Sequence, residues 1–141
     1  MFNFIEINKK DKSHIDSLFQ ILKKRTFNIS HDGETNYENH ITFVLESNYR
    51  KWFLINKNNQ TIGSYYLTFD NHIGLNLITD NVSDYILVIE YIISNEVPLP
   101  EIKSERNKSF LINSAPNNKI FIEAINHLKL KHIQNTYLCN I

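Results

Sequence analysis

The stretch HIGLNLITDNVSDYILVIEYII, residues 72–93, decides the fold. Its first part alternates, with Ile73, Leu75 and Leu77 on one face and polar or small residues on the other, which is typical of a half-buried strand. A polar loop follows, and residues 82–93 are then so continuously apolar that periodicity alone does not separate a buried helix from a strand. Their length favours a helix, so the stretch predicts a strand, a short loop and a helix.

Two strands precede this stretch and form a meander with it. Residues 52–55 are a short apolar run, and residues 61–69 are rich in the β-branched and aromatic residues that favour strands. The polar residues 57–60 between them are typical of a hairpin turn. Asp70 and Asn71 then turn the chain into the third strand, so we expect three consecutive antiparallel strands.

A strand and two helices are predicted ahead of the meander. Residues 2–7 are a short apolar run that indicates a strand. Asp11 can cap a helix whose apolar residues recur at three-to-four spacing: Ile15, Leu18, Phe19 and Leu22. A turn-rich loop at 28–36 leads to a second helix that is expected to end near Asn48. Its apolar stripe comprises His40, Ile41, Val44 and Leu45.

The last part of the chain predicts a strand, a helix and a strand. Residues 110–112 indicate a strand, and Asn117 or Asn118 can cap the helix that follows. Residues 132–138 read as a final strand. The complete order is β-α-α-β-β-β-α-β-α-β. Because it alternates throughout, it predicts an α/β fold with a mixed central sheet and helices on both faces.

Composition indicates one domain spanning residues 1–141. The chain is 42% hydrophobic and 21% charged, which fits an ordinary globular core. Fifteen basic residues balance fifteen acidic ones, so the charge offers no basic field for nucleic acid. No apolar run approaches the ~18 residues of a membrane span, and the first residues lack the pattern of an export signal. We therefore expect a soluble cytoplasmic protein whose single cysteine, Cys139, is a buried thiol.

Two common kinds of catalytic site are not indicated. The six histidines form no H-E-x-x-H pattern, so we expect no metal site. Ser30, His31 and Asp32 are consecutive, but a hydrolytic triad is assembled by the fold around a nucleophile on a tight turn. Their adjacency is therefore interpreted as accidental.

Three stretches together with the element order resemble the GCN5-related N-acetyltransferase (GNAT) superfamily. The first runs from Trp52 to Leu67 and contains Ile62-Gly63, similar to the opening of the family's third strand. The second is Asn71 to Ile78 with the loop and apolar helix behind it. The third is Ile112 to Ile133, with a helix opened by asparagine. The resemblance covers nearly the whole chain and is nearest to members that modify amino sugars of bacterial surface polysaccharides.

The resemblance implies acetyl-CoA as the acyl donor. In the family, the fourth and fifth strands splay apart, and backbone groups of the fourth strand hold the pantetheine arm. A loop of the form Gln/Arg-x-x-Gly-x-Gly/Ala at a helix N-terminus holds the pyrophosphate. The residues that match these positions, with the helix-opening asparagine, are Asn76, Leu77, Ile78, Asn81, Val82, Ser83, Asp84, Tyr85, Ile86 and Asn118.

This chain departs from the family pattern in the pyrophosphate loop. Asp84 and Ile86 replace the two small residues, so glycine's close backbone approach is lost. The Asp84 carboxylate would repel a diphosphate by about 4 kcal/mol per pair of unit charges at about 4 Å and an effective dielectric constant of about 20. Asp84 could alternatively bind the first N–H groups of the helix itself, which would occlude the anion site. Acetyl-CoA binding is accordingly the weakest element of the resemblance.

A second departure lies in the last helix. The family's tyrosine, commonly the general acid for the leaving thiolate, corresponds to Ile125. An aliphatic side chain there removes an assistance of about 10²- to 10⁴-fold. Asn118 does match the helix-opening asparagine, although an N-cap role is sufficient to explain it.

The resemblance also suggests where an acceptor amine would bind. His72 and Tyr66 lie on the central strands and are the candidate catalytic residues, since a histidine can exchange a proton near neutral pH. The candidate substrate-binding residues are Tyr37, His40 and Tyr65. Packing in the core or on the sheet surface is the simpler interpretation for the aromatic residues.

Two functions are compatible with these residues. One is an N-acetyltransferase that moves an acetyl group from acetyl-CoA to a small primary amine, with an amino sugar among the acceptors that fit. The other is a non-catalytic module that keeps the fold and has lost CoA binding, either as a homodimer or with a protein partner. The missing glycines, Asp84 and Ile125 favour the second reading, whereas the element order favours the first.

Overall fold

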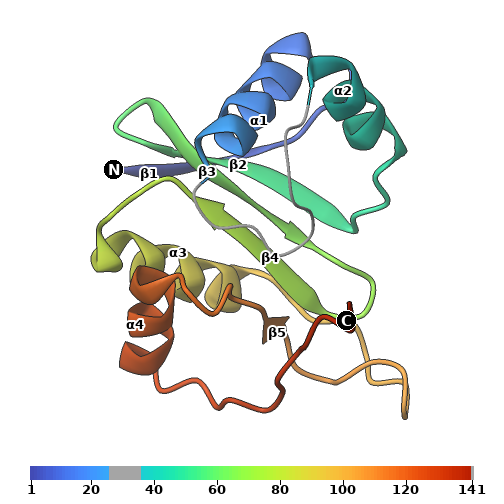
Figure 1. Ribbon diagram of the computed structural model, residues 1–141, viewed down its shortest axis with the longest axis vertical. Helices are drawn as coiled ribbons and strands as arrows, with labels where there is room; N and C mark the ends of the chain where they lie inside the picture. Colours follow the sequence, from blue (N-terminus) through green and yellow to red (C-terminus); the bar gives the residue numbers. More distant parts are fainter. Residues whose placement is uncertain (26–35, 141) are drawn as a thin grey trace.

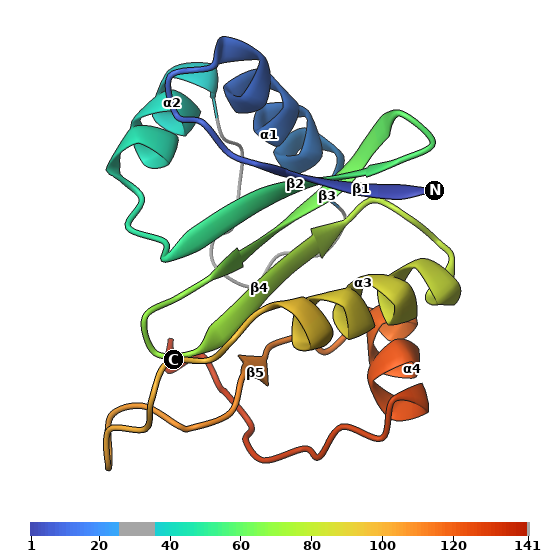
Figure 2. The same cartoon turned by 180° about the vertical axis from the view of Figure 1, so that it is seen from behind.

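The computed structural model describes residues 1–25 and 36–140. Figures 1 and 2 show a central sheet with helices on both sides. The elements are β1 (Phe2–Glu6), α1 (Lys12–Lys24), α2 (Tyr37–Glu46), β2 (Lys51–Lys57), β3 (Gln60–Leu67), β4 (His72–Leu77), α3 (Val82–Asn95), β5 (Leu111–Ile112) and α4 (Lys119–His127).

The sheet has the strand order β1-β2-β3-β4-β5. The first four strands pair antiparallel with their neighbours, whereas β4 and β5 are parallel, so the sheet is mixed. Helices α1 and α2 cover one face, and α3 and α4 cover the other (Figures 1 and 2). The predicted α/β fold with a mixed sheet and helices on both faces is confirmed, as is the helical assignment of residues 82–93.

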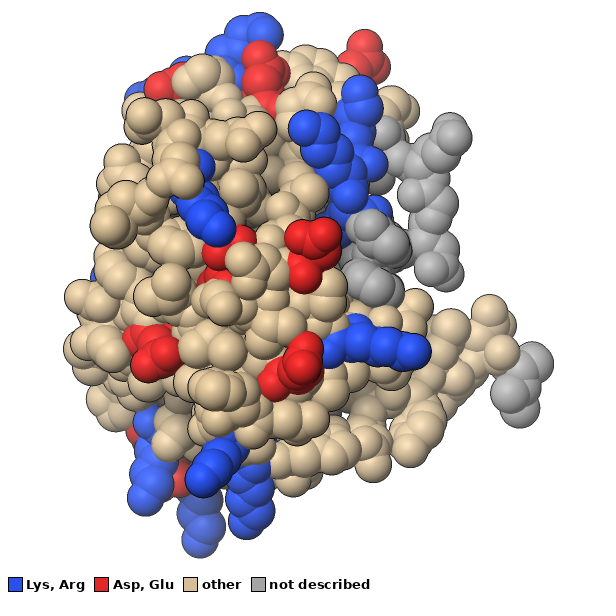
Figure 3. Space-filling view, turned by 90° about the vertical axis from the view of Figure 1, so that its left-hand side faces the viewer, with Lys and Arg blue, Asp and Glu red and all other residues tan. Residues whose placement is uncertain are grey.

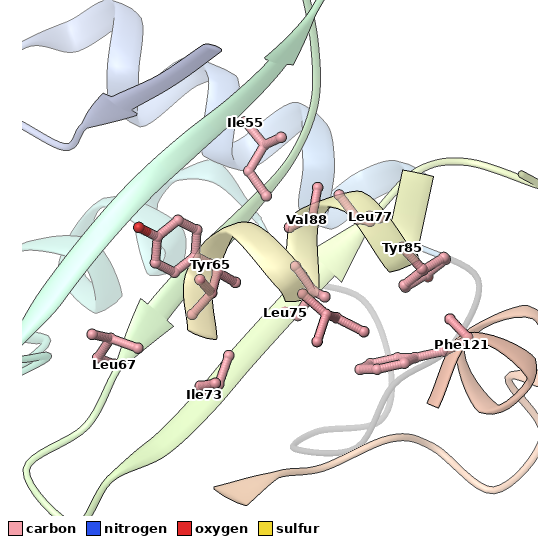
Figure 4. Packing of buried hydrophobic residues seen from close by; sticks show 12 residues of the cluster. Ile55, Tyr65, Leu67, Ile73, Leu75, Leu77, Tyr85, Val88 and Phe121 are labelled. Atoms are coloured by element: carbon pink, nitrogen blue, oxygen red, sulfur yellow. The ribbon is translucent and has the colours of Figure 1, made fainter. Parts of the chain in front are cut away.

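Alternation along the strands divides the core into two clusters. On the α3 and α4 face, buried residues of the sheet pack against Val88, Ile89 and Ile92 of α3 (Figure 4). On the α1 and α2 face, Trp52 and Leu54 pack against α1 and α2. Successive residues therefore serve opposite clusters, as the period of two in a strand requires. The sheet residues of the first cluster include Ile55, Tyr65, Leu67, Ile73, Leu75 and Leu77.

Helix α3 is held against β2 by an ion pair at each end. Lys57 Nζ lies 2.7 Å from Asp84 Oδ1 in the first turn, and Lys51 Nζ lies 2.9 Å from Glu96 Oε2 at the C-cap. The hydroxyl of Tyr65 donates to the second Glu96 oxygen at 2.9 Å. Both carboxylates are almost fully buried, so these partners are what makes their charge tolerable. The pairs fix α3 antiparallel to β2.

The helix caps agree with the sequence. Asp11 accepts from Ser13 N at α1, and Asn36 accepts from Asn39 N at α2. Asn118 accepts from Phe121 N, which decides between the two candidate caps of α4. The hairpin turn between β2 and β3 is also confirmed, with Asn58 and Asn59 at positive φ.

Three expectations near the surface were wrong. Residues 132–138 form no strand and are exposed, because no neighbouring strand within the described part of the chain pairs with them. Cys139 is exposed, not buried. Leu45 lies on the exposed side of α2, which is only ten residues long and buries His40 and Val44. The predicted loop at 28–36 and the residues Ser30, His31 and Asp32 lie almost wholly outside the described residues.

The surface carries charges of both signs. In Figure 3, lysine, arginine and acidic side chains share one face of the molecule, and no single sign covers it. Among the described residues, no helix is both long enough and apolar enough to cross a membrane.

Candidate functional site

Strands β4 and β5 pair only over their first two residues. The register joins His72 to Leu111 and Ile73 to Ile112, and β5 then ends. Strand β4 continues through Leu77. The strands predicted to splay are therefore paired at one end only, and β4 presents an edge of Gly74–Leu77 toward the side of β5. We call these residues the open edge.

Hydrogen bonds at both ends of β4 show which backbone groups face the open edge. Thr68 N donates to His72 O, and Ile78 N donates to Ile62 O, so even-numbered residues of β4 pair with β3. Leu111 N donates to Asn71 O on the other side. Backbone groups alternate in direction along a strand, so the N–H and C=O groups of Leu75 and Leu77 point toward β5.

No hydrogen bond from residues 1–25 or 36–140 reaches these groups of Leu75 and Leu77. Both residues are nearly buried, at 7% and 9% exposure. Buried backbone groups are almost always paired in native proteins, because leaving them unpaired costs free energy. Within the described residues, the open edge therefore offers two donors and two acceptors to an extended chain that carries amide groups.

The residues at the end of β4 that were predicted to bind the acyl donor differ in the direction of their backbone groups. The backbone of Leu77 faces the open edge, whereas the backbones of Asn76 and Ile78 pair with β3. The side chain of Asn76 points to the other face, where its Oδ1 accepts from Arg25 Nη1 at 3.1 Å. Leu75 was missed, although the alternation of Ile73, Leu75 and Leu77 was the signal that could have identified it.

His72 is the first residue of β4 and pairs with Leu111 of β5. Its Nδ1 is 3.0 Å from the side-chain nitrogen, Nδ2, of Asn113, which follows β5. Its Nε2 is 3.9 Å from an Asp70 oxygen, and the hydrogen bond from Thr68 lowers the pKa of the Asp70 carboxyl. The Asn113 side-chain amide and the Asp70 carboxylate thus lie at the two different nitrogens of the ring. This arrangement suits a proton acceptor.

Tyr66 lies flat over Gly74 on the same face of the sheet. A Cβ atom at Gly74 would lie 2.0 Å from the Tyr66 ring, and Tyr49 stacks on the opposite side of that ring at 3.8 Å between centroids. The structure therefore places Tyr66 in a packed aromatic stack above the central strand, one strand away from His72.

This packing leads to a stability prediction for Gly74→Ala. The added methyl group must displace a ring that is itself held by Tyr49, so we expect a loss of about 1–3 kcal/mol of unfolding free energy. Urea unfolding measures it. Tyr66→Leu replaces the ring by a smaller side chain, so it should recover most of the loss in the double variant. A single Gly74→Ala variant as stable as the parent would contradict the close contact.

The structure separates Tyr65 from the other two candidate substrate-binding residues, Tyr37 and His40, which both pack on Phe19 of α1. Tyr65 is fully buried on the α3 face and is committed to Glu96, which leaves it no surface for a substrate. Burial raises the pKa of the Tyr65 hydroxyl. Tyr37 opens α2 and its hydroxyl donates to Asp16 of α1. His40 is 3% exposed, and its Nε2 lies 3.0 Å from Ile15 O.

His40 gives a prediction for the pH dependence of stability. Burial lowers the pKa of the His40 imidazole, and the hydrogen bond to Ile15 and the charge of Asp16 oppose this only partly. The unfolded chain therefore binds a proton more readily, so the His40 contribution is complete above about pH 6.5 and is lost as the pH falls below it. His40→Gln should lose less unfolding free energy than the parent between pH 7.5 and 5. Equal losses in denaturant titrations would contradict this.

The first turn of α3 is filled by the chain's own groups. Asn81 Oδ1 accepts from Ser83 N at 2.9 Å, and Asn81 O accepts from Asp84 N at 3.1 Å. The Asp84 carboxylate accepts from Lys57 and, at 2.8 Å, from the hydroxyl of Thr79. Asp84 thus lies in the first turn as one reading expected, but its carboxylate binds those side chains and not the helix N–H groups.

The other predicted loop residues are packing residues. Val82 and Ile86 pack against the core, and Tyr85 is buried against Phe121 of α4. Asn118 caps α4, and its amide nitrogen lies 3.4 Å from the Tyr85 hydroxyl. The N-cap explanation of Asn118 is confirmed. Ile125 is half-buried against the same core.

The open edge fits the amide-bearing arm of a cofactor. The α3 turn does not fit a diphosphate, because the N–H groups of Ser83 and Asp84 and the Asp84 carboxylate already have partners. No three His, Cys, Asp or Glu side chains in the described ranges lie close enough together to hold a metal ion.

Comparison with known proteins shows the fold. The structure is similar to the aminoglycoside N-acetyltransferase AAC(6')-Iy in complex with CoA, with a TM-score of 0.63 and 10% identity over 100% of this chain and 95% of that one. It is also similar to a possible acetyltransferase from Clostridium difficile 630, with a TM-score of 0.54 and 13% identity over 100% and 98% of the two chains. No protein-family model and no curated protein matches the sequence.

The chain therefore shares the fold of these two structures, which agrees with the fold that its resemblance to the GNAT superfamily implied. The open edge of β4 and the neighbouring His72 define the candidate site within that fold.

Proposed function

We propose that this protein is an N-acyltransferase that moves an acetyl group from a pantetheine thioester such as acetyl-CoA to a small primary amine. The observation that carries the proposal is the open edge: the pairing of β4 with β5 ends after Ile73, and nothing in the described part of the chain hydrogen-bonds to the outward backbone groups of Leu75 and Leu77. The acetyltransferase fold of the two similar structures supports it. An amino sugar is the acceptor that the sequence resemblance suggests.

The residues of this chain would act by positioning and proton transfer. The open edge would pair with the amides of the pantetheine arm and so hold the thioester beside His72. The thioester would supply an activated carbonyl carbon. The amine nitrogen would form a bond to this carbon as the carbon–sulfur bond breaks, and the sulfur would leave as a thiolate that takes up the proton released by the new amide nitrogen. His72 would take the proton that the ammonium form of the amine must lose, with Asp70 stabilising the imidazolium.

Thiol release tests the proposal. The protein is incubated with acetyl-CoA or acetyl-pantetheine and a panel of primary amines that includes glucosamine, and the free thiol is measured with a chromogenic disulfide. We expect release that depends on both the protein and one class of amine, with the acetylated amine detected by mass spectrometry. No amine-dependent release with either donor would contradict the proposal.

A second function is favoured by the filled turn of α3. The same fold could serve as a non-catalytic module, because Asp84, Asn81 and Asn118 all have partners inside the protein. This module would bind neither donor. A homodimer, a protein partner and a cytoplasmic location remain predictions from the sequence for either function.

A further inference from the structure

The open edge and the first turn of α3 make opposite demands on an acyl donor. Among residues 1–25 and 36–140, no hydrogen bond reaches the two donors and two acceptors of Leu75 and Leu77 that face β5. In the first turn of α3, by contrast, the N–H groups of Ser83 and Asp84 and the Asp84 carboxylate already have partners. A donor that is bound by its arm would match the first feature, and a donor that is bound by its phosphates would not match the second.

The charge at the turn belongs to a closed network of side chains. Asp84 is 5% exposed, and its two oxygens accept from Lys57 and Thr79 at 2.7 and 2.8 Å. The single positive charge of Lys57 is therefore matched by the carboxylate it contacts. A diphosphate placed here would add negative charge beside Asp84 or would have to displace a buried carboxylate from its lysine. Both are unfavourable in a poorly solvated place.

The backbone of the turn is closed in the same way. The Asn81 side chain and carbonyl occupy the N–H groups of Ser83 and Asp84, and Asn81 N itself donates to Thr79 Oγ1 at 3.1 Å. No glycine lies between residues 75 and 86, so side chains stand wherever the backbone would have to approach a phosphate. The turn supports itself and presents little to an anion.

We infer that this protein recognises its acyl donor by the pantetheine arm and not by the diphosphate, so that a pantetheine thioester without a nucleotide is a sufficient donor. The inference rests on the proposed function. The open edge would accept any acyl thioester of a pantetheine arm. The arm can be free or attached through phosphate to a carrier, because these donors differ only in the part of the molecule that lies beyond the open edge.

Calorimetric titration of the unmodified protein compares acetyl-CoA with acetyl-pantetheine. We expect dissociation constants within about fivefold of each other. A working phosphate site with two charge-assisted hydrogen bonds would weaken acetyl-pantetheine by more than about 100-fold, and that result would overturn the inference while leaving the proposed function intact. Absence of heat with both compounds up to about 5 mM would instead remove the proposed function together with the inference.

A variant of Asp84 tests the cause. Asp84→Asn keeps the size of the side chain and removes its charge, so we expect acetyl-CoA to bind about tenfold more tightly and acetyl-pantetheine to change less than twofold. Glu96→Gln is the matched control, because it neutralises the equivalent buried carboxylate at the far end of α3. Equal shifts for both donors in Asp84→Asn, or the same gain in Glu96→Gln, would show that general loosening of α3 and not charge is responsible.

Discussion

Replacing His72 by glutamine is expected to lower the rate of acyl transfer by about 10²- to 10³-fold, while the donor binds as before. His72 is the titratable side chain beside the paired end of β4 and β5, and Asn113 and Asp70 lie on either side of its ring. Glutamine can replace the contact with Asn113 but cannot take a proton from an ammonium group. The magnitude is the usual contribution of a positioned general base.

The pH dependence of His72→Gln separates a base from a merely structural residue. Primary amines of the lysine type have a pKa near 10.4, so the neutral amine becomes more abundant as the pH rises. The defect should therefore shrink between pH 7 and 9, because the acceptor increasingly arrives without its proton. The measurement is the initial rate of thiol release with the amine that reacts fastest, and donor affinity is followed by calorimetry.

His127→Gln is the matched control, since His127 lies exposed in the last turn of α4. It should change the rate by less than about twofold. A His72→Gln variant within threefold of the parent at pH 7, or one whose defect is the same at every pH, would remove His72 from the reaction.

The arrangement of the sheet could be predicted largely from local patterns. The alternation of Ile73, Leu75 and Leu77 predicted which side of β4 is buried, and the aspartate and asparagine caps marked where α1 and α4 begin. These signals are local, because a strand's faces and a helix's first turn depend on residues two to four positions apart.

The features that the sequence did not reveal depend on partners far away in the chain. The strand expected at residues 132–138 has suitable residues but no neighbour to pair with, and a strand without a partner gains nothing from its propensity. One of the two interpretations of Asp84 placed its carboxylate on helix N–H groups, yet its partner Lys57 lies 27 positions earlier. Tyr65 and Tyr66 are adjacent and serve opposite faces, and only the tertiary structure shows which face carries His72.

Asn71→Ala is expected to destabilise the fold by about 3–5 kcal/mol. Asn71 is fully buried in the turn between β3 and β4, where its side chain donates to Leu99 O and Asn107 O and accepts from Leu99 N. Alanine leaves three buried backbone groups without partners, at about 1 kcal/mol or more each. It must also adopt the φ of 66°, which costs about a further 1 kcal/mol.

The contribution of the hydrogen bonds can be isolated with two further variants. Asn59→Ala places alanine at the same φ of 66° in an exposed hairpin turn, so it should cost only the backbone term of about 1 kcal/mol. Asn71→Gly removes the hydrogen bonds but tolerates the φ, so it should keep most of the Asn71→Ala loss. Urea unfolding followed by circular dichroism measures all three.

Because Leu111 N also donates to Asn71 O, a loosened turn should weaken the pairing of β5 with β4 and with it the definition of the open edge. An Asn71→Ala loss no larger than that of Asn59→Ala would show that the buried amide does not hold the 97–111 segment against the sheet.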